Sequence, residues 1–170
     1  DDLAEACRDM DGGIHVFGLD VTDMVGVKSC FDRISATVGV PELSVLNAGT
    51  HIFNSALDFD RDIFLKLMQI NYMGVVNCLQ VVVPAYLSHR RGDIAVVSSV
   101  AGYRGLPSAS AYGASKAALI NLCESLQPEL AMANVRLRLI NPGFVKTPLT
   151  DMNEFPMPFL MEVDAAAARI

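Results

Sequence analysis

The sequence predicts one α/β domain, in which a parallel sheet carries helices on both faces. Short apolar segments rich in β-branched residues alternate along the chain with longer segments that have helical periodicity. The 170 residues are 52% hydrophobic, which is enough for one sizeable core. The predicted helices are residues 1–10, 24–38, 60–88 and 110–132, and the predicted strands are residues 14–19, 43–47, 93–98 and 135–140.

Local sequence features support these elements in chain order. Gly12 and Gly13 follow helix 1–10 and suit a helix C-cap. The apolar runs near residues 43–47 and 137–140 suit inner strands, and strand 93–98 is an apolar run that closes on small hydroxyl residues. Arg136 and Arg138 indicate that one face of the last strand is partly exposed.

The composition argues against nucleic acid, a metal ion and a membrane span. The net charge is −6 and no basic cluster offsets it, so the phosphates of a nucleic acid would be repelled. The longest apolar segment, residues 73–87, contains Asn77, Gln80 and Pro84 and is too short and too polar to cross a bilayer. His15 and His89 lack the spacing of metal ligands.

The cysteines are widely separated and form no CxxC pair. We therefore expect reduced, mostly buried thiols and a cytoplasmic protein. The cysteines are Cys7, Cys30, Cys78 and Cys123.

Tyr112 and Lys116 are the most informative pair in the chain. They lie four residues apart in a predicted helix, so the phenol and the ammonium share one face. A nearby ammonium favours the phenolate and would lower the pKa of the phenol from its ordinary value of about 10. The pair therefore suits general acid–base chemistry, although such a pair alone is more often a solvated helix face.

Ser99 follows the predicted strand 93–98 and precedes Tyr112 by 13 residues. Ligands bind at the carboxyl ends of the strands in an open α/β sheet, so Ser99 and Tyr112 can converge on one crevice. Ser98 is the alternative, but strand alternation sends the two hydroxyls to opposite faces. The simpler role for a serine here is to cap the local backbone.

Together these residues resemble the classical short-chain dehydrogenase/reductase family. The resemblance assigns the family's catalytic asparagine, serine, tyrosine and lysine to Asn71, Ser99, Tyr112 and Lys116. Two further motifs match, Asn47-Ala48-Gly49 and the segment 141–147, although Leu46 replaces the asparagine that usually precedes the first motif. Asn71 also has a simpler role, in which its amide bonds to a neighbouring loop.

The resemblance implies a Rossmann-like doubly wound parallel sheet, lacking the first two strands and the last strand. The family opens with a strand and a glycine-rich turn that binds the cofactor pyrophosphate, and no such turn occurs here. Residues 14–19 correspond to the third strand, which would lack a neighbour in the order 3-2-1-4-5-6. We therefore expect residues 1–170 to be a single partial domain, incomplete at both ends and part of a longer polypeptide, with an uncovered edge at strand 43–47.

The resemblance also implies an NAD or NADP cofactor, and the residue that would choose between them belongs to the missing second strand. The residues expected to bind the cofactor are Asp20, Val21, Asn47, Ala48, Gly49, Tyr112, Lys116, Pro142, Gly143, Val145 and Thr147. Three of them have simpler alternatives. Asp20 suits a turn or a helix N-cap, Gly49 suits an ordinary turn, and Thr147 suits a turn with Pro148.

The implied activity is the interconversion of a carbonyl and an alcohol by hydride transfer, with Tyr112 as general acid/base. Lys116 would lower the pKa of Tyr112 and bind the nicotinamide ribose. Ser99 would polarise the substrate oxygen, and Asn71 would hold a water of a proton relay. The alternative is a non-catalytic, truncated member of the family that acts as an association module.

Other segments bear on the substrate and on assembly. The apolar segment 148–161 resembles the family's substrate-covering loop and indicates a hydrophobic substrate, although it could equally cover the core or a neighbouring subunit. His51 either faces the mouth of the site or is a surface or packing residue. Helices 60–88 and 110–132 correspond to the family's dimer helices, so a homodimer or homotetramer is expected.

Overall fold

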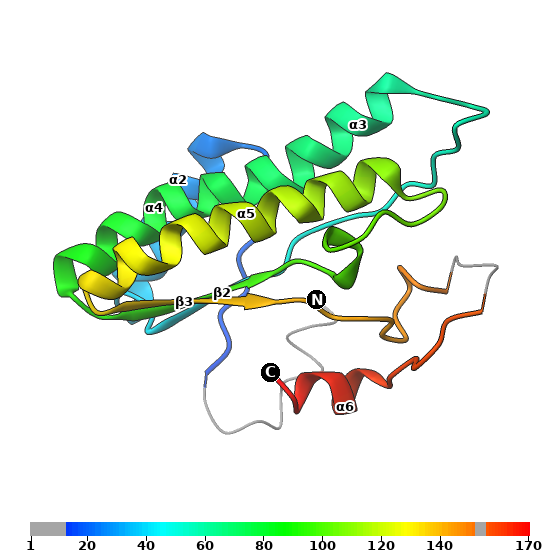
Figure 1. Cartoon of the computed structure of the whole chain (residues 1–170). Coiled ribbons are helices and arrows are strands. Elements are labelled where there is room, and N and C mark those ends of the chain that lie inside the picture. The colour runs from blue at the N-terminus through cyan, green and yellow to red at the C-terminus, as the bar shows by residue number, and fades with distance from the viewer. Residues whose placement is uncertain (1–12, 152–155) are drawn as a thin grey trace.

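Three parallel strands form the sheet, in the order β1-β2-β3 (Figure 1). The computed structural model describes residues 13–151 and 156–170, so the predicted helix 1–10 and Gly12 lie outside the described residues. β1 (Leu43–Leu46) pairs with β2 (Gly92–Val97), and β2 pairs with β3 (Val135–Ile140). These strands confirm the predicted segments 43–47, 93–98 and 135–140 to within one residue at each end.

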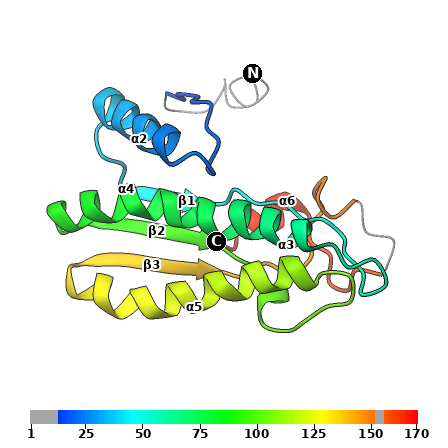
Figure 2. The ribbon, with the colours of Figure 1, turned by 90° about the horizontal axis from the view of Figure 1, so that it is seen from above.

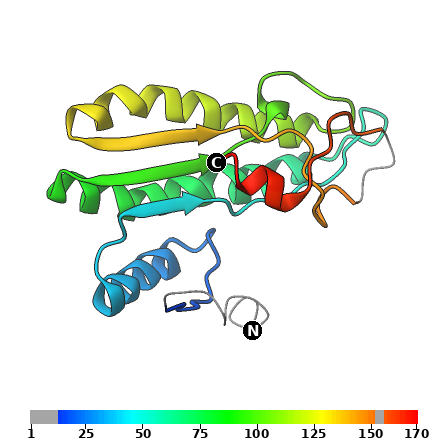
Figure 3. The same cartoon turned by 90° about the horizontal axis from the view of Figure 1, so that it is seen from below.

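The helices are α2 (Met24–Val38), α3 (Arg61–Leu67), α4 (Gly74–His89), α5 (Ser110–Met132) and α6 (Val163–Ala167), with a π-helical segment at Met68–Met73 and a 3-10 turn at Val100–Gly102. α4 and α5 lie over one face of the sheet, and α2 lies alongside α4 beyond the β1 edge (Figures 1 and 2). The short α6 lies on the other side of the sheet (Figure 3). This arrangement confirms the predicted Rossmann-like α/β fold, and α2 and α5 have their predicted bounds.

The core lies between the sheet and the two helices α4 and α5. Ile94 and Val96 of the central strand are fully buried, and they pack in one cluster with Tyr86 of α4 and Leu119 of α5. Gly92 begins β2 with a φ of 153°, and a Cβ at this position would overlap the Tyr86 ring. The turn from α4 into β2 therefore requires glycine.

The predicted strand 14–19 does not form. Residues 13–19 have no regular secondary structure, and the side chains of Ile14, Val16 and Leu19 are 43%, 44% and 43% exposed. A strand needs a neighbour that satisfies its amides and carbonyls, and no described strand lies beside this segment. β1 is consequently an edge of the sheet, where Leu43 and Val45 are each 54% exposed.

The predicted helix 60–88 forms, but it is not α-helical throughout. Its middle, Met68–Met73, is a π-helical segment that joins α3 to α4. π-helical turns are rare and frequently occur at functional sites. Asn71 lies in this segment and is fully buried.

Residues 61–89 are long and apolar enough to cross a membrane, judged by length and by a mean hydropathy of 1.3. The prediction from sequence rested on the shorter segment 73–87, which is too short and too polar to cross a bilayer. The core helix of a soluble protein meets the same criterion. Val75, Leu79 and Val82 of this helix are buried in the core cluster.

Arg136 and Arg138 confirm the prediction that one face of β3 is partly exposed. Both side chains are exposed, and their guanidinium nitrogens lie 2.7 and 3.5 Å from the carboxylate oxygens of Asp93 on β2. This ion-pair cluster occupies the face of the sheet opposite α4 and α5, which is open to solvent at β3.

The described cysteines are all free thiols. Cys30 and Cys123 are buried and Cys78 is half-buried, while Cys7 lies outside the described residues. Burial raises the pKa of the Cys123 thiol to about 11, which disfavours the reactive thiolate.

Candidate active site

Ser98 and Ser99 occupy different environments at the end of β2. Ser98 is buried, and its hydroxyl donates a 2.8 Å hydrogen bond to the Lys116 carbonyl. Ser99 precedes the 3-10 turn, and its hydroxyl accepts a 3.1 Å hydrogen bond from the Ala101 amide. The Ser99 hydroxyl also lies near the Tyr112 phenol and acts to lower its pKa. Ser99 therefore combines the local capping role with a contact to Tyr112, whereas Ser98 joins the strand to α5.

Tyr112 lies in the first turn of α5 and is half-buried. Burial raises the pKa of the Tyr112 phenol above its ordinary value, and the Ser99 hydroxyl acts in the opposite direction with a smaller effect. This corrects the expectation that Lys116 lowers the pKa of Tyr112. The Lys116 ammonium lies 5.7 Å from the centroid of the Tyr112 ring, and desolvation of the phenol dominates.

Lys116 is 4% exposed, which is unusual for a lysine. Its ammonium donates a 2.9 Å hydrogen bond to the Val97 carbonyl at the end of β2. Burial lowers the pKa of Lys116 to about 8. The ammonium is therefore held beside the end of β2 at neutral pH, and it loses its proton near pH 8.

Asn71 links the π-helical segment to the loop after β1. Its Oδ1 accepts a 2.8 Å hydrogen bond from the Thr50 amide, and its Nδ2 donates to the Thr50 carbonyl at 2.9 Å. Nδ2 also lies 3.0 Å from Ser115 Oγ. The simpler role predicted for Asn71, an amide bonded to a neighbouring loop, is thus present in the structure.

Ser115 is a buried residue beside Asn71 and Tyr112, and the family motifs did not single it out. Its hydroxyl donates a 2.7 Å hydrogen bond to the Tyr112 carbonyl and accepts from Asn71. The signal available in the sequence was its position, since a small hydroxyl residue three places after Tyr112 lies one helical turn away. Asn71 and Tyr112 are thereby connected through a single side chain.

Gly49 passes close to two members of the cluster. A Cβ at Gly49 would lie 3.4 Å from Asn71 Oδ1 and 3.5 Å from Lys116 Nζ. The loop after β1 therefore crosses beside the lysine and the asparagine.

His51 lies at the same end of the sheet. Its ring centroid is 4.9 Å from that of Tyr112 and 4.6 Å from that of Phe53. His51 thus packs beside Tyr112 and is partly buried, which is compatible with both the mouth position and the packing role.

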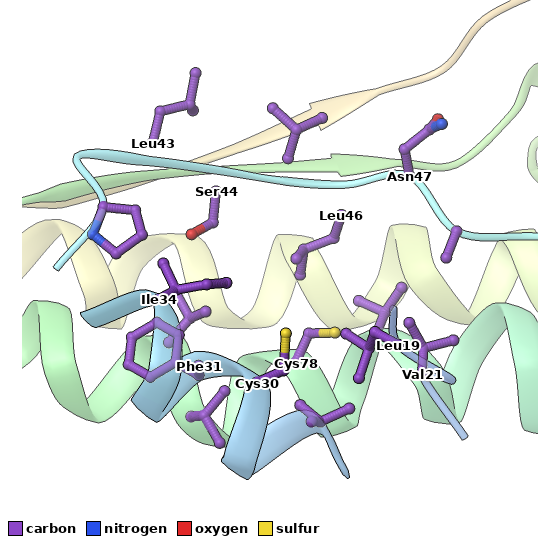
Figure 4. Close-up of a pocket in the computed structure, with 18 residues that line it drawn as sticks. Leu19, Val21, Cys30, Phe31, Ile34, Leu43, Ser44, Leu46, Asn47 and Cys78 are labelled. Atoms are coloured by element: carbon purple, nitrogen blue, oxygen red, sulfur yellow. The ribbon is translucent and has the colours of Figure 1, made fainter. Parts of the chain in front are cut away.

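A cavity of about 350 Å³ lies between α2, β1 and α4 (Figure 4). Val21, Asn47 and Ala48, three of the residues expected to bind the cofactor, belong to its lining. Figure 4 shows Ser44 and Leu46 pointing into the cavity, while Leu43 and Asn47 point to the other side of β1. Ser99, Tyr112 and Lys116 do not line the cavity, so the cavity is separate from these three residues.

Asp20 adopts the turn role that was its alternative. Its carboxylate accepts hydrogen bonds from the amide and the hydroxyl of Thr22 at 2.9 and 2.8 Å, and these bonds lower the pKa of the Asp20 carboxyl. The neighbouring Val21 reaches the cavity, and its carbonyl accepts a 2.9 Å hydrogen bond from Asn77 Nδ2.

The segment after β3 runs beside the 3-10 turn Val100–Gly102 that follows Ser99. The Pro142 carbonyl accepts a 3.1 Å hydrogen bond from the Val100 amide. Val145 forms a parallel bridge with Met161, so the chain after residue 155 folds back along residues 144–146. Thr147 donates its amide to Thr150 Oγ1 at 2.9 Å, which is the turn foreseen as its alternative role. Gly143 lies in the same segment and is exposed.

No candidate metal centre occurs among residues 13–151 and 156–170. His89 Nδ1 lies 2.8 Å from the Ala85 carbonyl, and His15 is exposed.

The order of these residues along the chain matches a known family. A model of the short chain dehydrogenase family matches residues 1–155, which include Asn71, Ser99, Tyr112 and Lys116. The chain belongs to the short-chain dehydrogenase family. The family resemblance stated from the motifs is therefore confirmed.

Curated relatives of this short-chain dehydrogenase chain extend beyond it. An uncharacterized oxidoreductase from Myxococcus xanthus is 39% identical over 87% of this chain and 58% of the relative. The 3-oxoacyl-[acyl-carrier-protein] reductase FabG from Thermotoga maritima is 32% identical over 89% of this chain and 61% of the relative. A 2-dehydro-3-deoxy-L-rhamnonate dehydrogenase (NAD(+)) from Sphingomonas sp. is 33% identical over 100% of this chain and 72% of the relative. The chain spans about three fifths of the first two.

Solved structures of short-chain dehydrogenases share the fold. The structure of ElxO with NADP bound is 25% identical and covers 98% of this chain with a TM-score of 0.88. A gluconate 5-dehydrogenase from Burkholderia cenocepacia, in complex with NADP and tartrate, is 27% identical and covers 88% of this chain with a TM-score of 0.81. This chain covers 73% and 58% of those two chains.

Proposed function

We propose that the polypeptide containing this chain is an NAD(P)-dependent oxidoreductase, which interconverts a carbonyl and an alcohol by hydride transfer. The observation that carries the proposal is the meeting of Ser99, Tyr112 and Lys116 at the carboxyl end of β2, where ligands bind in open α/β sheets. The relatives support the reaction class, since one is named an NAD(+) dehydrogenase and two solved neighbours hold NADP.

The described residues fit the nicotinamide end of such a cofactor. An ammonium has three donors, and the Val97 carbonyl takes one from Lys116, which leaves two for ribose hydroxyls. Gly49 runs beside Lys116 without a side chain, so the backbone allows close approach. When bound, the cofactor supplies or accepts the hydride. Pro142, Gly143, Val145 and Thr147 lie on the neighbouring loop and are proposed to complete this side of the site.

Tyr112 is the proposed general acid/base. In the reducing direction its phenol donates a proton to the substrate oxygen as a hydride reaches the carbonyl carbon, and the product is the alcohol. Burial keeps the pKa of Tyr112 above its ordinary value, so the phenol is protonated and ready to donate at neutral pH. In the oxidising direction the phenolate takes the proton from the alcohol, and this direction is favoured at higher pH.

Lys116 and Ser99 support this proton transfer from two sides. The Lys116 ammonium lies 5.7 Å from the ring centroid, where its charge is proposed to offset part of the desolvation cost of the phenolate that remains after proton donation. The Ser99 hydroxyl lies near the phenol and is proposed to hydrogen-bond the substrate oxygen as charge develops on it.

Asn71 is proposed to be a positioning residue, which holds the loop after β1 in place. Its amide binds both backbone groups of Thr50 and reaches Ser115, so it sets the loop after β1 relative to α5. A proton relay through a water held near Asn71 remains part of the proposal.

The family also suggests a proposal for assembly and location. We propose a cytoplasmic homodimer or homotetramer that associates through helix 61–89 and α5. Their solvent-exposed positions include the apolar side chains of Leu65, Met73, Leu87 and Met132, which an interface would cover.

Calorimetry with NADH and NADPH, followed by reduction of a ketone panel, tests the proposed function. Residues 1–170 and the longest natural polypeptide that contains them are compared. Cofactor binding and turnover by the longer polypeptide support the proposal, and failure of both proteins to bind either cofactor contradicts it. Binding by residues 1–170 alone would mean that the residues described above suffice without a glycine-rich turn.

A further inference from the structure

His51 lies against the tyrosine proposed as the acid/base. Its ring meets Tyr112 at a centroid distance of 4.9 Å and an interplanar angle of 69°, and it meets Phe53 at 4.6 Å and 73°. Both contacts are edge-to-face, a geometry that aromatic pairs favour. His51 is half-buried, so part of the ring is enclosed and part is accessible.

The backbone immediately before His51 is held by Asn71. The Asn71 amide binds both the N–H and the carbonyl of Thr50, at 2.8 and 2.9 Å. Because Asn71 is itself fully buried, this clamp is rigid and leaves His51 little freedom to move away from Tyr112.

The segment that carries His51 and Phe53 is also tied to α5 at its other end. The Asn54 side chain donates a 2.6 Å hydrogen bond to Ser110 Oγ and accepts a 3.3 Å hydrogen bond from the Ala111 amide. Asn54 is buried. The two rings therefore form a preorganised wall next to the proposed reaction site.

The two nitrogens of His51 differ in their surroundings. Nδ1 is buried and has no hydrogen-bond partner. A buried N–H without an acceptor is costly, so the proton of the neutral ring belongs on Nε2. Burial lowers the pKa of His51, which keeps the imidazole neutral at pH 7. Since Nδ1 is enclosed, the Nε2–H group is the donor that His51 can offer to a ligand.

We propose that His51 is a substrate-binding residue, which donates a hydrogen bond from Nε2 to an oxygen substituent next to the reacting carbonyl. The substrates favoured by this arrangement are hydroxyketones and other carbonyl compounds with an oxygen on the adjacent carbon. The inference rests on the proposed function, because it takes the carbonyl to lie at the Tyr112 hydroxyl. The adjacent carbon then lies within reach of a ring whose centroid is 4.9 Å from that of Tyr112.

Apolar packing is the competing explanation of the same contacts. In that case Phe at position 51 would serve as well as His, because it keeps both edge-to-face contacts. A hydrogen bond to the substrate, in contrast, makes the enzyme distinguish two substrates of equal shape that differ in one hydroxyl.

The test uses such a pair of ketones, 2-hydroxyacetophenone and propiophenone, which carry a hydroxyl or a methyl on the carbon next to the carbonyl. The protein is the longest natural polypeptide that contains residues 1–170, with NADH or NADPH. We expect kcat/KM to be about tenfold higher for 2-hydroxyacetophenone. His51→Phe should reduce this ratio of the two kcat/KM values, and His51→Asn should restore part of it. An equal preference in the wild type and in His51→Phe overturns the proposal, as does the absence of a preference in the wild type.

A binding measurement separates this proposal from the proposed function. The imidazole ¹⁵N resonances of His51 are assigned by their loss in His51→Phe and are followed during titration with each ketone. The Nε2 resonance should shift with 2-hydroxyacetophenone and stay unchanged with propiophenone. A selective shift without turnover would contradict the proposed function alone. Turnover of both ketones without a selective shift would overturn the role of His51 alone. The absence of both turnover and a selective shift would overturn both proposals.

Discussion

The Ser98 hydroxyl donates a 2.8 Å hydrogen bond to the Lys116 carbonyl, which ties the end of β2 to the beginning of α5. This bond fixes the helix that carries Tyr112 and Lys116 against the strand that delivers Ser99. The neighbouring Ser99 hydroxyl is half-buried and serves the 3-10 turn and Tyr112. Two adjacent serines of the same chemistry therefore have separable effects.

Ser98→Ala should lower the free energy of unfolding more than Ser99→Ala does. The Ser98 bond is buried, so its loss should cost about 1–2 kcal/mol and leave the Lys116 carbonyl without this partner. Ser99→Ala should cost less than about 1 kcal/mol but reduce kcat by about 10²-fold or more. Urea unfolding and steady-state kinetics on the two variants measure both effects. The reverse ranking would mean that Ser98 faces the substrate.

Reduction and oxidation should depend differently on pH. Burial raises the pKa of the Tyr112 phenol, so the protonated form needed for reduction persists well above neutral pH. The phenolate needed for oxidation increases about tenfold per pH unit below that pKa. We expect kcat/KM for oxidation to rise with this slope up to about pH 8, where Lys116 begins to lose its proton, while kcat/KM for reduction stays flat over the same range. A flat oxidation profile would exclude Tyr112 as the base.

Tyr112→Phe should reduce the rate about 10²- to 10⁴-fold in both directions and leave cofactor binding intact. Tyr103→Phe is the matched control, because Tyr103 is 65% exposed and its hydroxyl bonds only to the Asn141 side chain in the described structure. We expect this control to retain the wild-type rate. Equal losses in the two variants would point to a general effect of removing a hydroxyl from this region.

Lys116 should make stability depend on pH in the alkaline range. Burial lowers its pKa from 10.5 to about 8, so between these values the unfolded chain binds more protons than the folded chain. The free energy of unfolding therefore rises with pH across this window, and below about pH 8 the buried ammonium lowers stability. The wild type should gain about 1–3 kcal/mol over Lys116→Met between pH 7 and pH 10. Denaturant titrations at the two pH values measure this gain. Lys66 is exposed, so the wild type should show no such gain over the control variant Lys66→Met.

Asn71→Ala should be among the most destabilising substitutions at the site. It removes the two bonds to Thr50 and the bond to Ser115 from a fully buried position, for an expected loss of about 2–4 kcal/mol. Asn77→Ala is the control, since it removes one partly buried bond to the Val21 carbonyl and should cost about 1 kcal/mol. Similar losses in thermal or urea unfolding would mean that the Asn71 network adds nothing.

The amides of residues 13–19 should exchange with solvent far faster than those of β2. Residues 13–19 have no ladder partner, whereas β2 is paired on both sides. Hydrogen exchange followed by mass spectrometry compares the two segments within residues 1–170. Slow exchange in residues 13–19 would show that the segment finds a partner in solution, and the same measurement on a longer polypeptide would identify whether upstream residues supply it.

The sequence was a reliable guide where one local pattern decided the outcome. The apolar runs of β2 and β3 and the periodicity of α5 predicted their bounds, and the spacing of Tyr112 and Lys116 placed both on the side of α5 that meets the strand end. The local pattern alone wrongly predicted strand 14–19, because a strand forms only with a neighbour; the family's strand order had indicated that this neighbour is missing. The π-helical segment was also hidden, since apolar periodicity hardly distinguishes π from α over six residues.

Part of the site escaped prediction because it depends on distances between segments. Residue patterns could not tell that burial would dominate the pKa of Tyr112, because desolvation is set by the packing of the whole domain. They also gave no sign that His51 contacts Tyr112, because the two residues come from distant segments. Ser115 was recognisable as a small hydroxyl on the right face of the helix, but its partner Asn71 comes from another element.

The π-helical segment makes the spacing between α3 and α4 sensitive to the number of residues it contains. An α-helix turns by about 100° per residue, so deleting one residue from Met68–Met73 would rotate α3 relative to α4 by about that angle. Either the buried face of α4 or the Asn71 contact with Thr50 would then be lost. Insertions and deletions should consequently be tolerated far less in these six residues than in the exposed loops at either end of the helix, and natural length variation in this helix should avoid them.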